Sequence, residues 1–167
     1  MSKTITAVFD TRFEFESALR NLDQAGFSKD QVTMLVTEET RGKHFGIKES
    51  SKAEEGAATG AAVGGLVGAL SLSLASAGTL LIPGLNLVVS GALIGGLVGL
   101  GAGAATGGLI GSLVGLGIPE HEAKLYENAV RKGAILIAVE ARDDFRADRV
   151  KDILKSANAQ SVMPIAA

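Results

Sequence analysis

The two histidines and a short series of glutamates have the side chains most suited to catalysis or metal binding in this 167-residue chain. His44 and His121 lie far apart, and neither has a second ligand at the HxxxH or HExxH spacing of a metal site. Glu120, Glu122 and Glu127 resemble general acids or bases, but they fall in the opening half of an amphipathic helical pattern, where carboxylates complement the helix dipole. The sequence therefore predicts surface residues here, without metal or acid–base chemistry.

Motifs for nucleotides and nucleophiles are equally weak. The stretch "GAGAAT" at 101–106 begins like a dinucleotide fingerprint, but Thr106 occupies the last glycine position and no strand pattern precedes it. No GxxxxGK or GxSxG motif occurs. The net charge is −2, and the basic groups "RGKH" and "VRK" are short. We therefore expect no enzymatic activity, no cofactor, no nucleic-acid partner and no identifiable small-molecule substrate.

Glycine forms the strongest pattern in the chain. In "GALIGGLVGLGAGAATGGLIGSLVG" at 91–115 it recurs at every fourth position, and a shorter series precedes it. In a water-exposed helix each glycine is worse than alanine by about 1 kcal/mol, so the pattern needs compensation. Residues four apart share a helix face, and a row without side chains lets another backbone approach closely. The predicted helix-packing glycines are Gly56, Gly60, Gly64, Gly68, Gly91, Gly95, Gly99, Gly103, Gly107, Gly111 and Gly115.

These glycines lie in a run, 56–119, that contains no charged side chain. The run has 64 residues, whereas one membrane span needs about 20. Within "LLIPGLN", Pro83, Gly84 and Asn86 give a turn signal between two apolar stretches. The sequence therefore predicts a glycine-zipper helical hairpin. Its expected bounds are 56–117, with arms at about 57–81 and 86–116 and a turn at 82–86.

The charge distribution also predicts where such a hairpin lies. The turn has no Lys or Arg, whereas both flanks are charged. We therefore expect the turn to be translocated to the far side of the membrane and both termini to stay in the cytoplasm. No apolar signal-peptide region precedes Asp10, and the absence of cysteine fits a reducing interior. We expect a location in the cytoplasmic membrane. The alternative is a soluble cytoplasmic assembly that buries the apolar arms of many copies inside a particle.

The flanking segments, 1–37 and 118–167, have the patterns of an ordinary α/β unit. The first predicts strand, helix and strand, followed by a charged linker at 38–55. The second predicts helix, strand, helix and strand. Without the hairpin and the helix after it, this order is the split βαβ pattern of a ferredoxin-like sheet. We therefore predict an α+β fold, interrupted by the hairpin, whose sheet needs cover or a partner on one face.

Two stretches, "VFDTRFEFESALRNLDQAGFSKDQVTMLV" and "GIPEHEAKLYENAVRKGAILIAVEA", enclose the glycine-rich run. Over nearly its whole length the chain resembles the bacterial general-stress and low-temperature-induced membrane proteins that have an N-terminal heat-induced-stress-type domain. The resemblance implies a stress-related, membrane-associated protein without an assigned reaction, and it supplies no catalytic residues. Its most specific part comprises Gly117, Ile118, Pro119, Glu120, Glu122, Ala123, Tyr126, Glu127 and Gly133.

Three functions are consistent with these patterns. The leading expectation is a non-enzymatic bacterial membrane protein that self-associates through glycine-zipper helices, with a cytoplasmic ferredoxin-like domain. Its partners are other copies of itself and the lipid bilayer. The second is the soluble particle described above. The third is a membrane-anchored sensor whose α/β domain binds a small ligand, an idea that rests on fold analogy alone.

Overall fold

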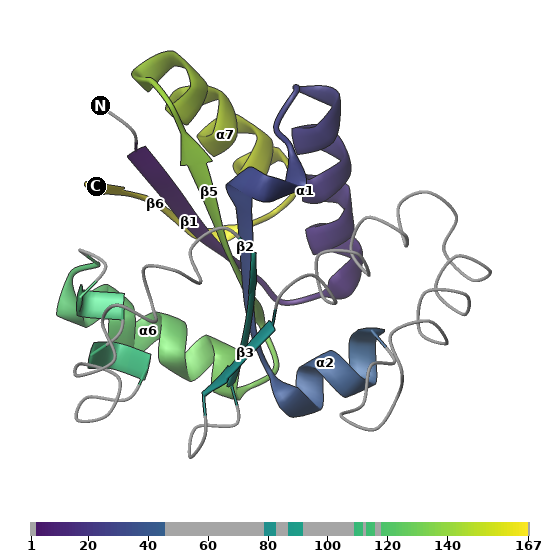
Figure 1. Ribbon diagram of the computed structural model, residues 1–167, viewed down its shortest axis with the longest axis vertical. Coiled ribbons are helices and arrows are strands. Elements are labelled where there is room, and N and C mark those ends of the chain that lie inside the picture. Colours follow the sequence, from purple (N-terminus) through teal and green to yellow (C-terminus); the bar gives the residue numbers. More distant parts are fainter. Residues whose placement is uncertain are drawn as a thin grey trace.

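The computed structural model describes residues 3–45, 79–82, 87–91, 109–111, 113–115 and 118–166. This part of the chain forms one antiparallel sheet with helices on both faces, so the α+β class predicted from the sequence is confirmed (Figure 1). The elements in chain order are β1 (Lys3–Phe9), α1 (Arg12–Gln24), η1 (Lys29–Gln31), β2 (Val32–Thr37), α2 (Glu38–Phe45), β3 (Thr79–Ile82), β4 (Leu87–Gly91), α6 (Glu120–Arg131), β5 (Ile135–Ala141), α7 (Asp144–Ser156) and β6 (Gln160–Ala166).

The sheet has six strands in the order β3-β4-β2-β5-β1-β6. Every neighbouring pair is antiparallel. The pairing of β1 with β5 is unbroken from Lys3↔Ala141 to Phe9↔Ile135. All four strands predicted in the flanking segments are present, and β3 and β4 extend the sheet beyond β2.

The helices α1 and α7 begin in the same way. Each has 13 residues and follows a seven-residue strand after two connecting residues. The Thr11 hydroxyl accepts a hydrogen bond from the Glu14 backbone N–H, and the Asp143 carboxylate accepts one from the Arg146 N–H. These side chains bind backbone donors that have no partner inside the helix. Thr11 and Asp143 are therefore the N-caps of the two helices.

Both helices also end in the same way. Gly26 has a φ of 81° and Asn158 a φ of 62°, and each reverses the chain after the last helical turn. The N–H of the next residue then donates to the carbonyl oxygen of Leu22 in α1 or Leu154 in α7. This left-handed ending is the usual helix stop at glycine or asparagine. The two strand–helix units are thus structural repeats.

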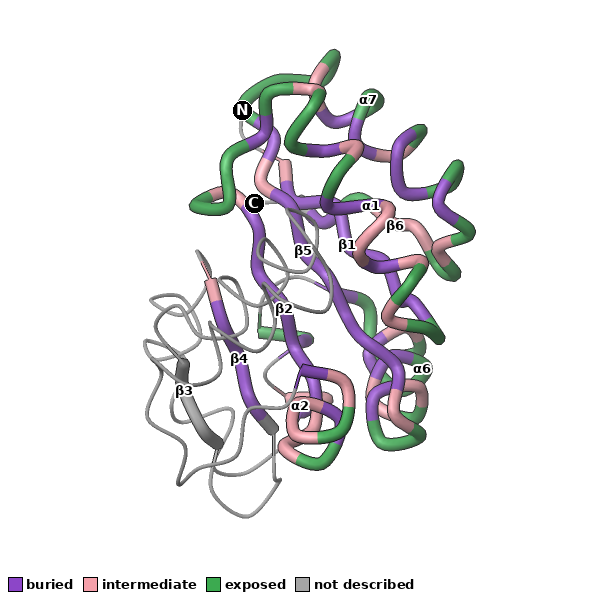
Figure 2. Tube along the Cα trace, turned by 90° about the vertical axis from the view of Figure 1, so that its right-hand side faces the viewer, coloured by how far each residue is buried: buried purple, intermediate pink, exposed green. Residues whose placement is uncertain are grey.

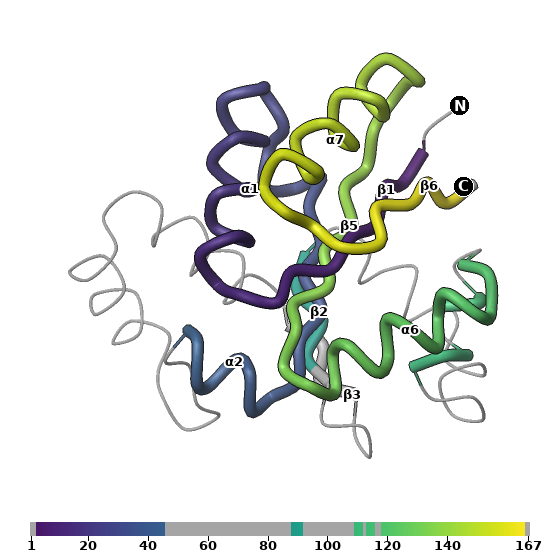
Figure 3. Tube along the Cα trace, turned by 180° about the vertical axis from the view of Figure 1, so that it is seen from behind, coloured from purple at the N-terminus to yellow at the C-terminus, as the bar shows by residue number. Residues whose placement is uncertain are grey.

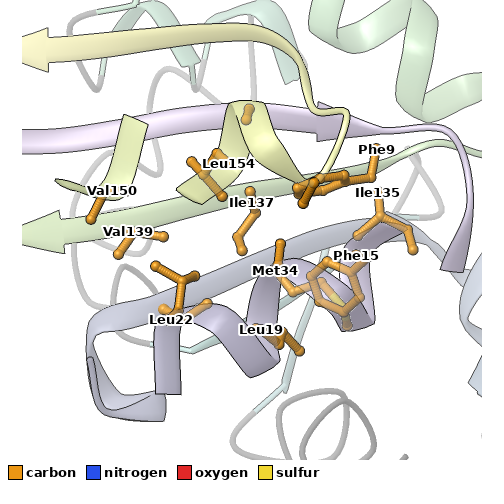
Figure 4. Close-up of a cluster of buried hydrophobic side chains, with 14 of the residues drawn as sticks. Phe9, Phe15, Leu19, Leu22, Met34, Ile135, Ile137, Val139, Val150 and Leu154 are labelled. Carbon is orange, nitrogen blue, oxygen red and sulfur yellow. The ribbon is translucent and has the colours of Figure 1, made fainter. Parts of the chain in front are cut away.

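The larger hydrophobic cluster lies between the sheet and the pair α1 and α7. Phe15 and Leu22 of α1 face Leu154 of α7 across the strand residues Met34 and Ile137 (Figure 4). All five side chains are almost completely buried. Alternate residues of each strand point to this face, as the two-residue period of a strand requires. Seen from behind, α1 and α7 run side by side over the sheet (Figure 3).

A second cluster covers part of the opposite face of the sheet. Tyr126 and Val130 of α6 pack with Leu136 of β5, and Leu109 and Leu113 belong to the same cluster. Residues 109–111 and 113–115 are helical. The face expected to need a partner is therefore covered in part by the chain itself.

The predicted helical arms are wrong at 79–81 and 87–91, because these residues form most of β3 and all of β4. The chain does reverse at the predicted place, since Ile82 pairs with Leu87, but the reversal joins strands. The rest of both arms lies largely outside the described residues. The first eight residues of the predicted charged linker form α2.

Two phenylalanines of α1 give a matched test of this core. Phe15 is fully buried, whereas Phe13 is 76% exposed. We expect Phe15→Ala to lower the free energy of unfolding by about 3–5 kcal/mol, because it leaves a cavity. Phe13→Ala should change it by less than about 0.5 kcal/mol. Urea denaturation of both variants measures the difference, and equal losses would contradict the packing of α1.

Candidate functional site

The candidate functional site is the glycine-rich insertion and the places where it joins the sheet. Most of its predicted packing residues lie outside the described structure. Within it, Gly111 and Gly115 are in helical conformation, whereas Gly91 is in a strand. The residues outside it are Gly56, Gly60, Gly64, Gly68, Gly95, Gly99, Gly103, Gly107 and the turn residues Pro83, Gly84 and Asn86.

Gly91 does not belong to a helical glycine row. It ends β4 opposite Thr33 and has a φ of 117°, a conformation that residues with a side chain rarely adopt. A Cβ atom placed on Gly91 would lie 2.1 Å from the carbonyl oxygen of Val32. Glycine is therefore needed here because the β4 backbone meets the β2 backbone closely. The assignment of Gly91 to helix packing is corrected on this ground.

The strand β4 attaches the middle of the apolar run to the sheet. It pairs with β2 from Thr33↔Gly91 to Thr37↔Leu87 and lies between β2 and β3 (Figure 2). Val88 joins the cluster under α1 and α7, and Val89 joins the cluster on the opposite face. Alternate residues of one short strand thus enter both clusters, as the strand period requires.

The insertion leaves the sheet through α2, whose end is held by Arg12. The Arg12 Nε atom lies 2.6 Å from Glu16 Oε1, and a terminal guanidinium nitrogen donates to the His44 carbonyl oxygen. The guanidinium also lies over the Phe45 ring, 5.4 Å from its centroid. Phe45 in turn makes an edge contact with Phe15, with 6.2 Å between ring centroids. The exit of the insertion is therefore fixed to the start of α1 and to the core.

The insertion returns to the sheet through Leu109, Leu113 and Ile118. These side chains are at most 3% exposed and pack in the cluster of α6. The Ile118 N–H donates to the Leu113 carbonyl oxygen at 3.1 Å, which closes the turn before α6. The insertion is thus held by the sheet and its helices at its beginning, in its middle and at its end.

A hydrogen-bond network fixes α6 to the sheet. The Tyr126 hydroxyl donates to the Ser161 carbonyl oxygen at 2.8 Å and lies 3.1 Å from Thr6 Oγ1. The Thr6 hydroxyl also donates to the Met163 carbonyl oxygen at 3.3 Å, which ties the network to a second residue of β6. Ser161 has a φ of 50° and lies in a bulge of β6 opposite β1, which interrupts the regular pairing. Burial is the main reason that the pKa of Tyr126 is raised.

In the sequence, Tyr126 was noted only as one of the residues that carry the family resemblance, and no structural role was predicted for it. A local signal was present, because Ala123, Tyr126 and Val130 have the three- and four-residue spacing of a buried helix face. The polar partners Thr6 and Ser161 come from distant strands. Sequence alone did not reveal that these strands meet at this helix.

The ionisable groups at the start of α6 lie on the surface or in ion pairs. Glu120 pairs with Lys124 at 2.7 Å, which lowers the pKa of Glu120, and Glu127 pairs with Arg131 at 2.8 Å. The His121 side chain is 74% exposed, so its predicted surface position is confirmed. These i,i+4 pairs are typical of a solvated helix face.

His44 is half-buried, unlike the surface residue predicted from the sequence. Burial, and to a lesser degree the charges of Lys43 and Arg12, lower the pKa of its imidazole. Within the described ranges, no three His, Asp or Glu side chains form a group able to hold a metal ion.

The comparisons with known proteins add no assignment. The chain matches no protein-family model, no curated protein and no solved structure. In the part of the chain that the structure describes, no helix has the length and apolar character that a membrane span needs. The resemblance to general-stress membrane proteins therefore stays a prediction.

The Tyr126 network predicts a specific loss of stability. Tyr126→Phe removes the hydroxyl, so the Ser161 carbonyl oxygen and the buried Thr6 hydroxyl both lose this partner. We expect the free energy of unfolding to fall by about 1–2 kcal/mol. The neighbouring Leu125 is 55% exposed, and Leu125→Ala should change stability by less than about 0.5 kcal/mol. Urea denaturation measures both, and an unchanged stability for Tyr126→Phe would contradict the network.

The environment of His44 predicts a pH effect on stability. Its pKa in the folded protein lies below the ordinary value of 6.5, so the unfolded chain binds the proton more readily. Stability should therefore fall as the pH drops below about 6.5 and should be unaffected by His44 above it. His44→Gln should reduce the loss between pH 7.5 and 5.5, as measured by thermal unfolding. The exposed His121→Gln is the control, and equal pH profiles for wild type and His44→Gln would contradict the assignment.

Proposed function

We propose that the protein is a non-enzymatic, self-associating protein whose glycine-rich segments pack copies together. The observation that carries this proposal is the attachment of one long insertion, which contains every predicted packing glycine, to the sheet at its exit, middle and return. In this proposal the α+β unit holds the ends of the segments, and the glycine-rich residues between them make the contacts with other copies. The resemblance to general-stress proteins adds the expectation that the protein acts in a bacterial stress response.

The α+β unit that holds the insertion is proposed to be ferredoxin-like. Without β3 and β4 its strand order is β2-β5-β1-β6, and all pairs are antiparallel. The helices α1 and α7 pack on one face and follow β1 and β5 with the same lengths and the same caps. Two such repeats in this order support a split βαβ arrangement.

The pairing of β4 with β2 bears on whether lipid or protein surrounds the glycine-rich segments. Because β2 and β4 belong to one sheet, a segment between them has to return to the side of a membrane that it left. Two crossings need about 40 apolar residues, whereas the uncharged part of 46–78 is residues 56–78, or 23 residues. The second segment, 92–108, has 17 residues. With β4 paired to β2, packing between copies in a lipid-free particle is therefore favoured over a spanning hairpin.

Replacing three glycines of the second segment by leucine tests the proposed packing. Gly99→Leu, Gly103→Leu and Gly107→Leu combined should break the oligomer, because bulk on the contact face prevents close approach of backbones. The matched control combines Val98→Leu, Ala102→Leu and Thr106→Leu, which have the same spacing but lie one residue away. We expect the control to keep the wild-type mass in light scattering after gel filtration.

Each outcome of this experiment is informative. An oligomer that keeps its size in the glycine variant would overturn packing through this row. A wild-type protein that is monomeric in the absence of detergent would overturn self-association itself. Flotation with lipid vesicles then separates a membrane-bound assembly from a lipid-free particle.

A further inference from the structure

The two largest exposed apolar side chains that the structure describes occupy equivalent positions in the two structural repeats. Phe13 is 76% exposed and Phe145 is 82% exposed. Each lies two residues after the N-cap of its helix, which is Thr11 in α1 and Asp143 in α7. A single exposed apolar side chain needs no explanation. The same aromatic residue at the same exposed place in both repeats indicates a shared role.

Both phenylalanines point away from the sheet. Phe13 comes two residues before the buried Phe15, and Phe145 comes two residues before the buried Ala147. A step of two residues turns an α-helix by about 200°, so each aromatic ring lies on the side of its helix opposite the core. The outer surface of α1 and α7, which faces away from the sheet, therefore has one exposed aromatic ring on each helix.

The two rings lie at opposite ends of this outer surface. The strands β1 and β5 are antiparallel, and each is followed by its helix after two connecting residues. The helices α1 and α7 therefore run side by side in opposite directions (Figure 3). Each helix has 13 residues, which is a length of about 20 Å. The first turns of the two helices, and with them the rings, are thus separated by roughly 15–20 Å along the helix direction.

The charges on the outer surface are mixed and nearly balanced. Three basic and four acidic residues of the two helices are exposed, namely Arg20, Asp23, Asp144, Asp148, Arg149, Asp152 and Lys155. A membrane or a nucleic acid attracts a surface with an excess of lysine and arginine. A surface on which both signs are interspersed is instead complementary to a second copy of itself. The charge pattern therefore favours another copy of this chain as the partner.

We propose that the outer surface of α1 and α7 is an interface between two copies of the chain, separate from the glycine-rich segments. In a two-fold symmetric contact the same patch of each copy meets the other. Phe13 and Phe145 of both copies are then removed from water together, and aromatic side chains are the usual anchors of such contacts. The glycine-rich segments and the outer surface belong to different parts of the chain. Two different self-contacts link copies into an assembly larger than a dimer.

Hydroxyl-radical footprinting of the wild-type protein tests this interface without any substitution. Oxidation of Phe13 and Phe145 should slow by about fivefold or more as the protein concentration rises and copies associate, because the contact excludes water from both rings. Leu125 of α6 is 55% exposed and should be oxidised at the same rate throughout. Fragment spectra separate Phe13 from the buried Phe15. Unchanged oxidation of both exposed phenylalanines across these concentrations would overturn the interface.

Substitution of the two rings measures what they contribute. In the Gly99→Leu/Gly103→Leu/Gly107→Leu protein we expect a monomer–dimer equilibrium in sedimentation equilibrium, because the outer surface is intact. Adding Phe13→Ser and Phe145→Ser should raise the dissociation constant of this dimer by about tenfold or more. Adding Leu125→Ser, at an exposed position of α6, is the control and should change it by less than about twofold. Urea denaturation checks that each variant stays folded.

The outcomes separate this interface from the proposed glycine packing. A glycine variant that is monomeric at every concentration, or a dimer unaffected by loss of both rings, would overturn the interface and leave the glycine packing standing. A glycine variant that keeps the wild-type mass would overturn the glycine packing. In that case protection of Phe13 and Phe145 from oxidation would still support the interface, and the absence of protection would overturn it.

Discussion

The pairing of β2 with β5 is the constraint on which the rest of the structure depends. It joins Val32↔Val139 to Leu35↔Leu136 and so brings together the two ends of an insertion of 97 residues, 38–134. Closing a loop of this length is feasible because the entropy cost rises slowly, by about 0.6 kcal/mol for each doubling. Once the ends meet, every segment between them starts and finishes at the same sheet. That condition limits what the glycine-rich residues can do while the sheet is intact.

Much of the fold could be predicted from the flanking segments because their local signals agree with the tertiary structure. In the sequence, Phe15 and Leu22 have the spacing of one helix face. Thr11 and Gly26 are of the residue types that favour the beginning and the end of a helix. The same kinds of signal gave α6 and α7. The sequence predicted a split βαβ pattern but no order of the strands within the sheet, and the ferredoxin-like assignment stays a proposal.

The middle of the apolar run could not be predicted in this way because two local patterns compete there. The sequence "LLIPGLNLVVSG" has a four-residue connection containing glycine between apolar stretches, with two valines in the second, and this favours a β-hairpin. The four-residue glycine spacing that includes Gly91 favours a helix. Pairing with β2 decided the outcome, since Val88 and Val89 enter clusters on opposite faces of the sheet. Contacts of this kind depend on residues far away in the chain.

The most direct test of this account is a nuclear magnetic resonance measurement of residues 87–91 in the intact protein. The account predicts strand chemical shifts there and nuclear Overhauser contacts between Leu35 and Val89, which are paired across β2 and β4. Helical shifts at 87–91, with sequential amide contacts and none to β2, would contradict it. That result would restore the continuous helical arm and remove the attachment from which the function is inferred.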